Sequence, residues 1–365
     1  MAAEIENQRI AKLTPLNEVV QSFDTSVEPV APREEDIGTA LGKTLAADMG
    51  VSEAWPAAAI ALRDGFAVSA DQTTDASSYA PAPLSPAPVR VDAGDLLPAQ
   101  ADAVAPLDAV NAQGAALASV APGEGVLPAG ADAAPGVVRL TGGRLRKIDV
   151  ATLTALGVKR VMIREPRVHV VATGKSDVIA AATGLIANAI DSDGGFSIRT
   201  DNLETSLKDG STDCVVAIGG TGQGRNDNSV NTLARIGKIL FHGIGITPGE
   251  TTAFGFVGKR PVLLLPGRVD TALAGWLTVG RRMLARLCFR LMEEQPFPAE
   301  LGRKIVSPLG LAEVVPIRRR AGLVEPLASG YLPMQALARS EGWILIPADS
   351  EGHPQGARVI VRPWP

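Results

Sequence analysis

The sequence predicts a multidomain α/β protein, and three observations support this fold class. The chain has 365 residues, more than one hydrophobic core usually serves, so we expect two to four domains. Hydrophobic residues make up 46% and charged residues 20%, as in folded globular proteins. In the middle of the chain, apolar runs alternate with amphipathic segments, which is typical of a mostly parallel sheet with helices on both faces.

This alternation lies in residues 166–295. We expect strands at 167–172, 196–199, 214–218, 238–241 and 261–265, and helices at 177–190, 203–208, 230–236 and 269–293. The strand segments are apolar at nearly every position, which is typical of parallel strands buried on both faces. The pattern predicts a three-layer α/β domain.

The flanking segments have other patterns. We expect helices at 16–23 and 148–156, and at 32–49, where Ile37, Leu41 and Leu45 recur at helical spacing. Residues 53–134 hold short apolar runs between Gly, Pro, Asp and Asn, which predicts an inserted β-rich domain. Residues 296–365 hold four short strand-like runs and predict a small all-β domain. The remaining segments, 1–52 and 135–165, would link these domains.

Charge, hydropathy and cysteine content bear on the class of protein. The net charge is −4, so the chain as a whole shows no electrostatic signature of nucleic-acid binding. No apolar stretch approaches the roughly 20 residues of a membrane helix, and residues 1–10 lack an apolar secretion segment. Cys214 and Cys288 have apolar neighbours and are expected to be buried free thiols. We expect a cytoplasmic protein.

Two common kinds of catalytic site have little support. His169, His242 and His353 are far apart in the sequence, and no Cys-x-x-Cys or His-Glu-x-x-His spacing occurs. No Gly-x-Ser-x-Gly motif occurs either, so a serine hydrolase is not indicated.

Four loops are expected at the carboxyl ends of the central strands, where open α/β sheets bind ligands. They are Thr173-Gly174-Lys175-Ser176, Gly219-Gly220-Thr221-Gly222, Pro248-Gly249, and Pro266-Gly267-Arg268, the last with Thr271 shortly after it. Glycine lets backbone N–H groups approach an anion, and helix N-termini favour negative charge. Together the loops predict a phosphate-binding site, although no complete P-loop or dinucleotide motif is present.

Seven short motifs occur in a characteristic order. They are Ala61-Leu62-Arg63-Asp64-Gly65-Phe66-Ala67-Val68, the segment 91–104 that ends Ala-Asp-Ala-Val, Ala129-Gly130-Ala131-Asp132, Ala172-Thr173-Gly174, Gly219-Gly220, Pro248-Gly249 with Ala253-Phe254-Gly255, and Leu265-Pro266-Gly267. A further element, Leu337-Ala338-Arg339-Ser340-Glu341-Gly342, follows near the end. This series resembles the molybdopterin molybdenumtransferases, the family that includes bacterial MoeA and the gephyrin E domain. The resemblance extends over nearly the whole chain.

The resemblance implies an elongated subunit with a helical dimerisation region, which forms a homodimer. It also implies that the α/β domain binds molybdopterin or adenylylated molybdopterin, into which the family inserts molybdenum from molybdate. The family's site lies between the α/β domain of one subunit and the β-rich domain of the other. Asp64 and Asp132 match carboxylates on the β-rich side and are the candidate catalytic residues, although Asp in such loops often serves only a turn. The need for Mg²⁺ and molybdate, and any metal ligand, stay open.

Several charged positions depart from the family's pattern. Lys175 and Ser176 stand where the family has Asp and Glu, and Gly243, Thr247 and Glu250 stand where it has three lysines. A molybdate site needs fixed cations and carboxylates, so we expect molybdenum insertion to be impaired.

Three functions stay open after these departures. The first is a molybdopterin-binding transferase of this family with altered groups. The second is a non-catalytic carrier or scaffold that holds the cofactor for a molybdoenzyme or another cofactor-biosynthesis protein. The third is a regulator that binds a nucleotide or sugar phosphate, which predicts adenine nucleotide binding without a preference for pterins.

Overall fold

The chain forms two compact units in a computed structural model that describes residues 8–290 and 296–365. Unit 1 comprises Met1–Ala47, Gly142–Lys147 and Arg160–Pro365, and unit 2 comprises Asp48–Thr141 and Ile148–Lys159. The predicted α/β multidomain class is confirmed. The finer division into four parts stays a prediction.

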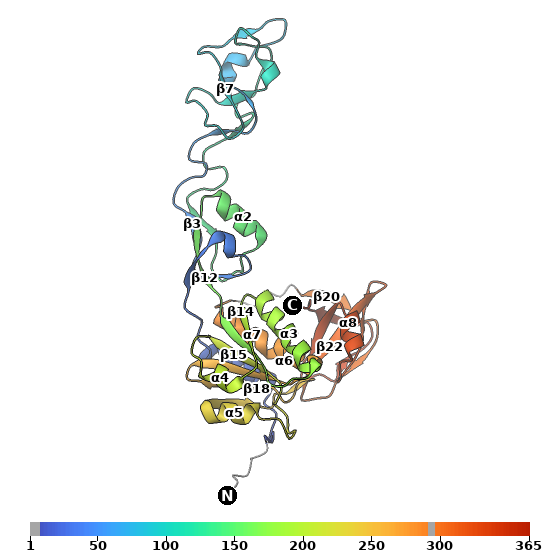
Figure 1. Cartoon of the computed structure of the whole chain (residues 1–365). Helices are drawn as coiled ribbons and strands as arrows, with labels where there is room; N and C mark the ends of the chain where they lie inside the picture. The colour runs from blue at the N-terminus through green and yellow to red at the C-terminus, as the bar shows by residue number, and fades with distance from the viewer. Residues whose placement is uncertain (1–7, 291–295) are drawn as a thin grey trace. The chain divides into compact units, whose positions relative to one another are not determined.

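A six-stranded sheet forms the centre of unit 1 (Figure 1). Its order is β14 (Phe196–Thr200), β13 (Arg167–Ala172), β15 (Cys214–Ile218), β19 (Arg260–Leu265), β18 (Ala253–Val257) and β16 (Lys238–His242). The first four strands pair in parallel, whereas β18 is antiparallel to both of its neighbours. The sheet is therefore mostly parallel, as the sequence predicts.

Helices cover both faces of this sheet. One face packs against α1 (Leu16–Ser26), α3 (Asp177–Ser192), α6 (Val269–Gly275) and α7 (Arg281–Leu287), and the other packs against α4 (Leu203–Lys208) and α5 (Ser229–Ile236). Along β13, Val170 belongs to the first core and Val171 to the second. Because successive side chains point to opposite faces, burial on both faces accounts for the continuous apolar runs.

The long helix predicted at 269–293 is divided and shorter. A π-helical segment, Trp276–Gly280, separates α6 from α7, which ends at Leu287. The ring of Trp276 lies against Gly280, where a Cβ atom would overlap it. Phe289 then has φ 53°, which does not continue a right-handed helix. Residues 291–293 of the predicted helix lie outside the described residues.

The helix predicted at 32–49 is wrong. The segment forms β1 (Arg33–Asp36), a 3₁₀ turn (Ile37–Thr39), β2 (Thr44–Leu45) and the start of β3 (Met49–Val51). Both β1 and β2 pair with β12 (Arg160–Arg164). Ile37 and Leu45 are buried whereas Leu41 is exposed, so the three residues do not share a face. Pairing with the distant β12 overrides the local helical spacing.

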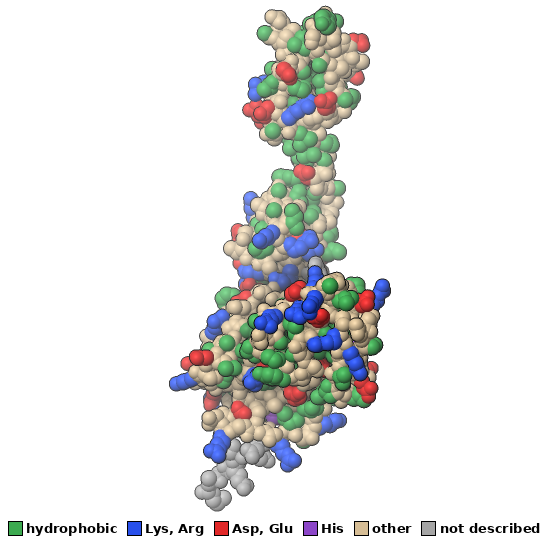
Figure 2. Space-filling view, turned by 90° about the vertical axis from the view of Figure 1, so that its right-hand side faces the viewer, with side chains coloured by type: hydrophobic (Ala, Val, Ile, Leu, Met, Phe, Trp, Pro, Cys, Tyr) green, Lys and Arg blue, Asp and Glu red, His purple; other side chains and the backbone are tan. Residues whose placement is uncertain are grey.

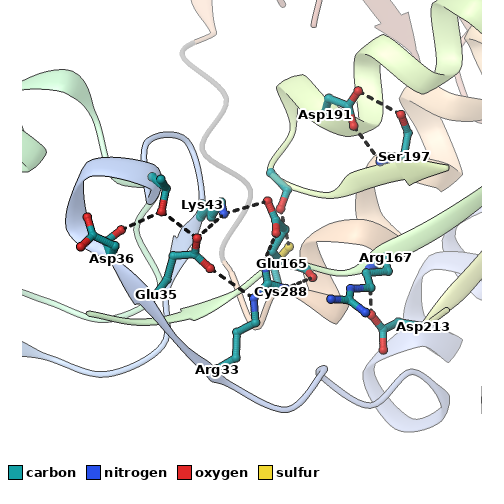
Figure 3. A network of polar contacts seen from close by, with 12 residues as sticks. Arg33, Glu35, Asp36, Lys43, Glu165, Arg167, Asp191, Ser197, Asp213 and Cys288 are labelled. Carbon is teal, nitrogen blue, oxygen red and sulfur yellow. Dashed lines mark hydrogen bonds and ion pairs between the residues drawn. The ribbon is translucent and has the colours of Figure 1, made fainter. Parts of the chain in front are cut away.

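An ion-pair network connects this three-stranded sheet to the segment before β13 (Figure 3). Lys43 Nζ lies 3.2 Å from a carboxylate oxygen of Glu35 and 3.6 Å from one of Glu165, and Arg33 contacts both carboxylates. A hydrogen bond from Thr39, together with Lys43, lowers the pKa of Glu35. The network fixes the strands relative to each other within unit 1.

The C-terminal segment of unit 1 is built mainly from strands. They are β20 (Phe297–Glu300), β21 (Ile305–Val306), β22 (Ala312–Arg320), β23 (Leu323–Pro326), β24 (Gly342–Ile346), β25 (Gly352–His353) and β26 (Arg358–Val361). A short strand of the α/β part, β17 (Ile246–Thr247), pairs with β22. The expectation of an all-β segment needs one correction, because α8 (Met334–Arg339) follows Pro333 with strong helix formers such as Ala336 and Leu337.

Unit 2 consists of short strands, one α-helix and two 3₁₀ turns, Ala70–Thr73 and Leu107–Ala109. The strands are β3, β4 (Ile60–Ala61), β5 (Gly65–Val68), β6 (Ala82–Pro83), β7 (Val89–Val91), β8 (Ala103–Ala105), β9 (Ala115–Ala116), β10 (Val126–Leu127) and β11 (Gly136–Arg139). Helix α2 (Lys147–Ala155) confirms the helix expected at 148–156, and Gly157 after it has φ 80°. Two small cores, rich in Ala and Val, hold the strands together.

Surface charge and buried thiols follow the composition. On the face drawn in Figure 2, basic and acidic side chains are interspersed. Within the described residues, no helix is long and apolar enough to cross a membrane.

Cys214 and Cys288 are buried free thiols, as predicted. Burial raises the pKa of both thiols, and it raises the pKa of Cys288 to about 11.

Candidate functional site

Three of the four predicted loops meet at one edge of the six-stranded sheet. β13, β15 and β19 are parallel neighbours, and their last residues, Ala172, Ile218 and Leu265, lie side by side in the register. The hydroxyl of Thr173 donates to the carbonyl of Ile218 at 2.9 Å, and the N–H of Gly219 donates to the carbonyl of Leu265 at 2.8 Å. The loops that follow the three strands are therefore in contact.

Glycine is required where these loops touch. Gly219 has φ 103°, and a Cβ atom there would lie 2.6 Å from the hydroxyl of Thr173. A Cβ atom on Gly267 would lie 3.3 Å from the Cα atom of Gly219. A larger residue at Gly219 would thus displace the loop that contains Thr173, which explains why this position is glycine.

The Pro248-Gly249 loop joins the same group. A Cβ atom on Gly249 would lie 3.0 Å from the carbonyl oxygen of Thr271, in the first turn of α6. The hydroxyls of Thr221 and Thr251 lie 2.9 Å apart. All four loops predicted from the sequence therefore lie together.

The two predicted cations have different surroundings. Lys175 is exposed, immediately before α3, and forms no hydrogen bond or ion pair with any residue that the structure describes. Ser176 caps α3 by accepting a hydrogen bond from the N–H of Ile179 at 3.3 Å. The start of α3 thus carries the ammonium group of Lys175, which suits an incoming anion, beside the exposed carboxylate of Asp177 in the first turn, with which Lys175 forms no ion pair.

Arg268, at the start of α6, is already engaged. Its Nε donates to Asp270 at 3.1 Å, and its guanidinium lies 5.1 Å from the centre of the Tyr331 ring. Tyr331 and then Asp270 raise the pKa of Arg268. The Asp270 side chain is 1% exposed, and its second carboxylate oxygen is buried without a hydrogen-bond partner. The net positive charge that Arg268 offers to a ligand is therefore reduced.

A polar pocket of about 300 Å³ lies at the carboxyl ends of β13, β14 and β15. It is lined by Thr173, Asp201, Asn202, Leu203, Gly220, Asn226, Asn228, Ser229 and Thr232. Of these residues, only Thr173 and Gly220 belong to the loops predicted from the sequence. The available signal was that Asp201 and Asn202 directly follow β14, another parallel strand. The lining offers amide and hydroxyl groups that can both donate and accept hydrogen bonds.

Residues 243–250, where the family resemblance leads us to expect three lysines, contain no Lys or Arg. Gly243 has φ 93°, and a Cβ atom there would overlap the Cγ2 atom of Ile10. Thr247 is buried, and the Glu250 carboxylate accepts from the N–H of Gly249 at 3.1 Å. The loop thus presents a carboxylate to its surroundings.

Asp64 and Asp132 lie in unit 2 and are not brought together there. The β4–β10 ladder pairs Ile60 with Leu127, so Asp64 follows one end of the ladder and Asp132 the other. Asp64 is exposed and accepts a hydrogen bond from the N–H of Ala93 at 2.9 Å. Asp132 is also exposed, and its N–H donates to Trp55. Asp64 therefore stabilises a turn in this structure, as Asp-Gly segments often do.

Potential metal ligands are dispersed in the described part of the chain. Among residues 8–290 and 296–365, taken together, no group of three or more His, Cys, Asp or Glu side chains is arranged to hold a metal ion. His242 instead lies 3.1 Å from the carbonyl of Thr221, and His169 lies near Thr212. The donor set gives no support to a preformed Mg²⁺ site.

Family models match two segments of the chain. Residues 14–157 match the MoeA N-terminal region (domain I and II), and residues 199–286 match a model described as a probable molybdopterin binding domain. Together the matches cover more than half of the chain.

Individual proteins agree with these matches. A protein of Methanocaldococcus jannaschii named as a molybdopterin biosynthesis protein is 27% identical, over 90% of this chain and 91% of its own. Molybdopterin molybdenumtransferase 1 of Mycobacterium tuberculosis is 27% identical, over 70% of this chain and 65% of its own. A crystal structure of the molybdopterin biosynthesis MoeA protein from Pyrococcus horikoshii superposes with a TM-score of 0.75 at 25% identity, over 97% of this chain and 100% of that one.

The fold, the glycine loops at the sheet edge and these matches agree with one another over nearly the whole chain. The chain belongs to the MoeA family of molybdenum-cofactor biosynthesis proteins.

Proposed function

We propose that the chain binds molybdopterin, free or adenylylated, at the carboxyl edge of the six-stranded sheet. The observation that carries this proposal is that four glycine-containing loops lie together at this edge, with Gly219 against Thr173 and Gly267, and Gly249 against Thr271. Lys175, in the first of these loops, has no partner among the described residues. The edge combines a site for an anion with a site for a neutral ring, and molybdopterin has both a phosphate and a pterin.

The anion would lie at the start of α3. Lys175 supplies a full positive charge there, and the helix N-terminus adds a favourable dipole. A charge-assisted hydrogen bond of this kind contributes about 1.5–3 kcal/mol. The neighbouring pocket, lined by Asn202, Asn226 and Asn228, would take the pterin ring. Side-chain amides match the alternating donors and acceptors of such a heterocycle.

Molybdenum insertion is proposed to be weak or absent. Molybdate is a dianion that must approach an already anionic pterin, so a loading site needs preorganised positive charge. Gly243, Thr247 and Glu250 provide none, and the Glu250 carboxylate repels the oxyanion. Asp270 in addition offsets the charge of Arg268. The dispersed potential metal ligands lead us to assign no step to Mg²⁺.

An alternative is a non-catalytic carrier or scaffold that holds molybdopterin for a molybdoenzyme or another biosynthetic protein. The same charge pattern favours it, since the ring pocket and Lys175 are present while the loading groups are not. In either role we propose a homodimer in the cytoplasm, in which Asp64 and Asp132 face the ligand of the other subunit. The two roles differ in turnover and share the ligand.

Mass spectrometry of the purified protein tests the shared part of the proposal. The full chain would be expressed in one bacterial host that makes molybdopterin and in a matched host that cannot. We expect a pterin phosphate in the first preparation and none in the second. An adenine nucleotide or sugar phosphate in both preparations, without any pterin, would contradict the proposal and support a phosphate-binding regulator.

A further inference from the structure

The side chain of Gln8 connects two parts of the candidate site, and no sequence motif indicates this role. Its side-chain Nε2 donates to the carbonyl of Gly220 at 3.0 Å and to the carbonyl of Gly222 at 2.9 Å. Its Oε1 accepts from the N–H of Val230 at 2.8 Å and from that of Asn231 at 3.1 Å. One side chain therefore joins the glycine loop after β15 to the first turn of α5.

The Gln8 amide uses its whole hydrogen-bonding capacity in these contacts. An amide side chain has two N–H donors and an oxygen with two lone pairs, and each of the four is engaged. The residue is only 6% exposed. Because unpaired buried polar groups are costly, this position accepts few replacements.

The segment that carries Gln8 is anchored to the same unit. The N–H of Thr14 donates to the carbonyl of Gly243 at 2.9 Å, and the N–H of Gly245 donates to the carbonyl of Thr14 at 2.8 Å. Ile10 lies directly against Gly243. These contacts hold the chain at Ile10 and Thr14, just after Gln8, and so help to present the Gln8 side chain to the loop.

Gln8 also decides which helix can bind an anion at this edge. The N–H groups of Val230 and Asn231 belong to the first turn of α5, where no carbonyl of the helix itself can accept from them. Gln8 occupies both of them. At the start of α3, Ser176 caps one N–H group, that of Ile179, and Lys175 has no partner among the described residues. This helix start, with its ammonium group, is then the position that remains for the anion.

The loop held by Gln8 lines the polar pocket. Gly220 and Ser229 are both lining residues, and a Cβ atom on Gly220 would overlap the Ser229 hydroxyl. The conformation of Gly220, with φ 71°, is thus fixed from one side by Ser229 and from the other by the Gln8 amide.

We propose that Gln8 is a positioning residue for ligand binding: it fixes the Gly219–Gly222 loop and directs the ligand's phosphate to Lys175 by capping α5. The inference rests on the proposed binding of molybdopterin at this edge. Gln8 acts through the loop and the helix, not by touching the ligand.

Two substitutions in the full chain separate the functions of the Gln8 amide. Gln8→Glu keeps an oxygen that can accept from Val230 and Asn231 but loses both donors to the loop. Gln8→Leu loses donors and acceptors alike. Gln21→Glu, at an exposed position of α1, is the control. Hydrogen–deuterium exchange without ligand should show faster exchange of the loop in Gln8→Glu, with Val230 and Asn231 still protected, and faster exchange of both in Gln8→Leu.

Titration with molybdopterin then measures the effect on the ligand. We expect Gln8→Glu to bind about tenfold more weakly than the wild type, because two hydrogen bonds that order the loop are lost, whereas Gln21→Glu should bind normally. In the Gln8→Leu background, Lys175→Ala should lose less affinity than in the wild type, since the freed N–H groups of α5 offer the phosphate a second position.

The outcomes distinguish this inference from the proposed function. A wild type that does not bind molybdopterin contradicts the proposed function and, with it, the ligand-directing role. A wild type that binds, with unchanged affinity and unchanged loop exchange in Gln8→Glu, contradicts the role of Gln8 alone. An equal loss from Lys175→Ala in both backgrounds contradicts the direction of the phosphate by α5 capping.

Discussion

Arg268 and Asp270 form an ion pair two residues apart at the start of α6, with 3.1 Å between the guanidinium Nε and the carboxylate Oδ1. The arginine is 54% exposed and the aspartate 1% exposed. The buried Asp270 carboxylate thereby partly neutralises the charge of Arg268, the side chain that would face the ligand. Lys175, on the neighbouring loop, has no such partner in the described part of the chain. The two cations should therefore contribute unequally to binding.

Lys175→Ala should weaken molybdopterin binding more than Arg268→Ala does. Loss of the unpaired ammonium should cost about 1.5–3 kcal/mol, or about ten- to a hundredfold in affinity. Arg268→Ala should cost less because its charge is shared with Asp270. Isothermal titration would measure both, with Lys259→Ala, at an exposed position paired with Glu28, as the control. Unchanged affinity in both variants would place the ligand elsewhere.

Asp270→Asn should strengthen anion binding. The substitution removes the negative charge beside Arg268 and preserves the size of the side chain. Because the guanidinium of Arg268 is 54% exposed and solvent screens its charge, we expect a gain of only about threefold in affinity. The same titration checks it, and a loss of affinity would show that Asp270 orients Arg268 productively rather than neutralising it.

Complementation of a bacterial strain that lacks its own molybdenumtransferase should fail or be weak at low molybdate. The reason is the absence of positive charge at Gly243, Thr247 and Glu250, because members of a cooperative site act as a unit. Nitrate reductase activity is the readout. Full rescue at low molybdate would refute the proposed loss of insertion, whereas failure together with retained pterin binding would favour the carrier role.

Gly243→Ala should destabilise unit 1 strongly. The new Cβ atom would overlap Ile10, and φ 93° is unfavourable for any L side chain. We expect a loss of about 2–3 kcal/mol in the free energy of unfolding, measured by urea denaturation. Gly258→Ala is a matched control, because its φ is 61° but no atom lies within 4 Å; its loss should be about 1 kcal/mol. Equal losses would mean that the Ile10 contact is easily displaced.

The protein should be a homodimer in solution. The family resemblance implies dimerisation, and an aliphatic interface can sustain an obligate dimer despite the low aromatic content of 4%. Multi-angle light scattering at micromolar concentration would give about twice the monomer mass. A monomer would also contradict a site that needs Asp64 or Asp132 from a second subunit.

The sequence by itself determined the elements whose signal is local. The strand at Cys214–Ile218 and the helix at Leu203–Lys208 have the predicted bounds, because apolar runs and helical spacing report burial within a short window. The glycine loops could also be placed at one edge, since parallel strands bring their carboxyl ends together.

Tertiary structure alone decided the features that depend on distant residues. Residues 32–49 form strands because β12 provides a partner, and no pattern within that segment predicts its pairing with β12. Asp270 pairs with Arg268 and offsets part of its positive charge. Gln8 donates a hydrogen bond to Gly220, which is 212 residues away in the sequence. A local window records which side chains are apolar, but it cannot record which polar groups meet, because hydrogen bonds are selected by the three-dimensional packing that brings their donors and acceptors within reach.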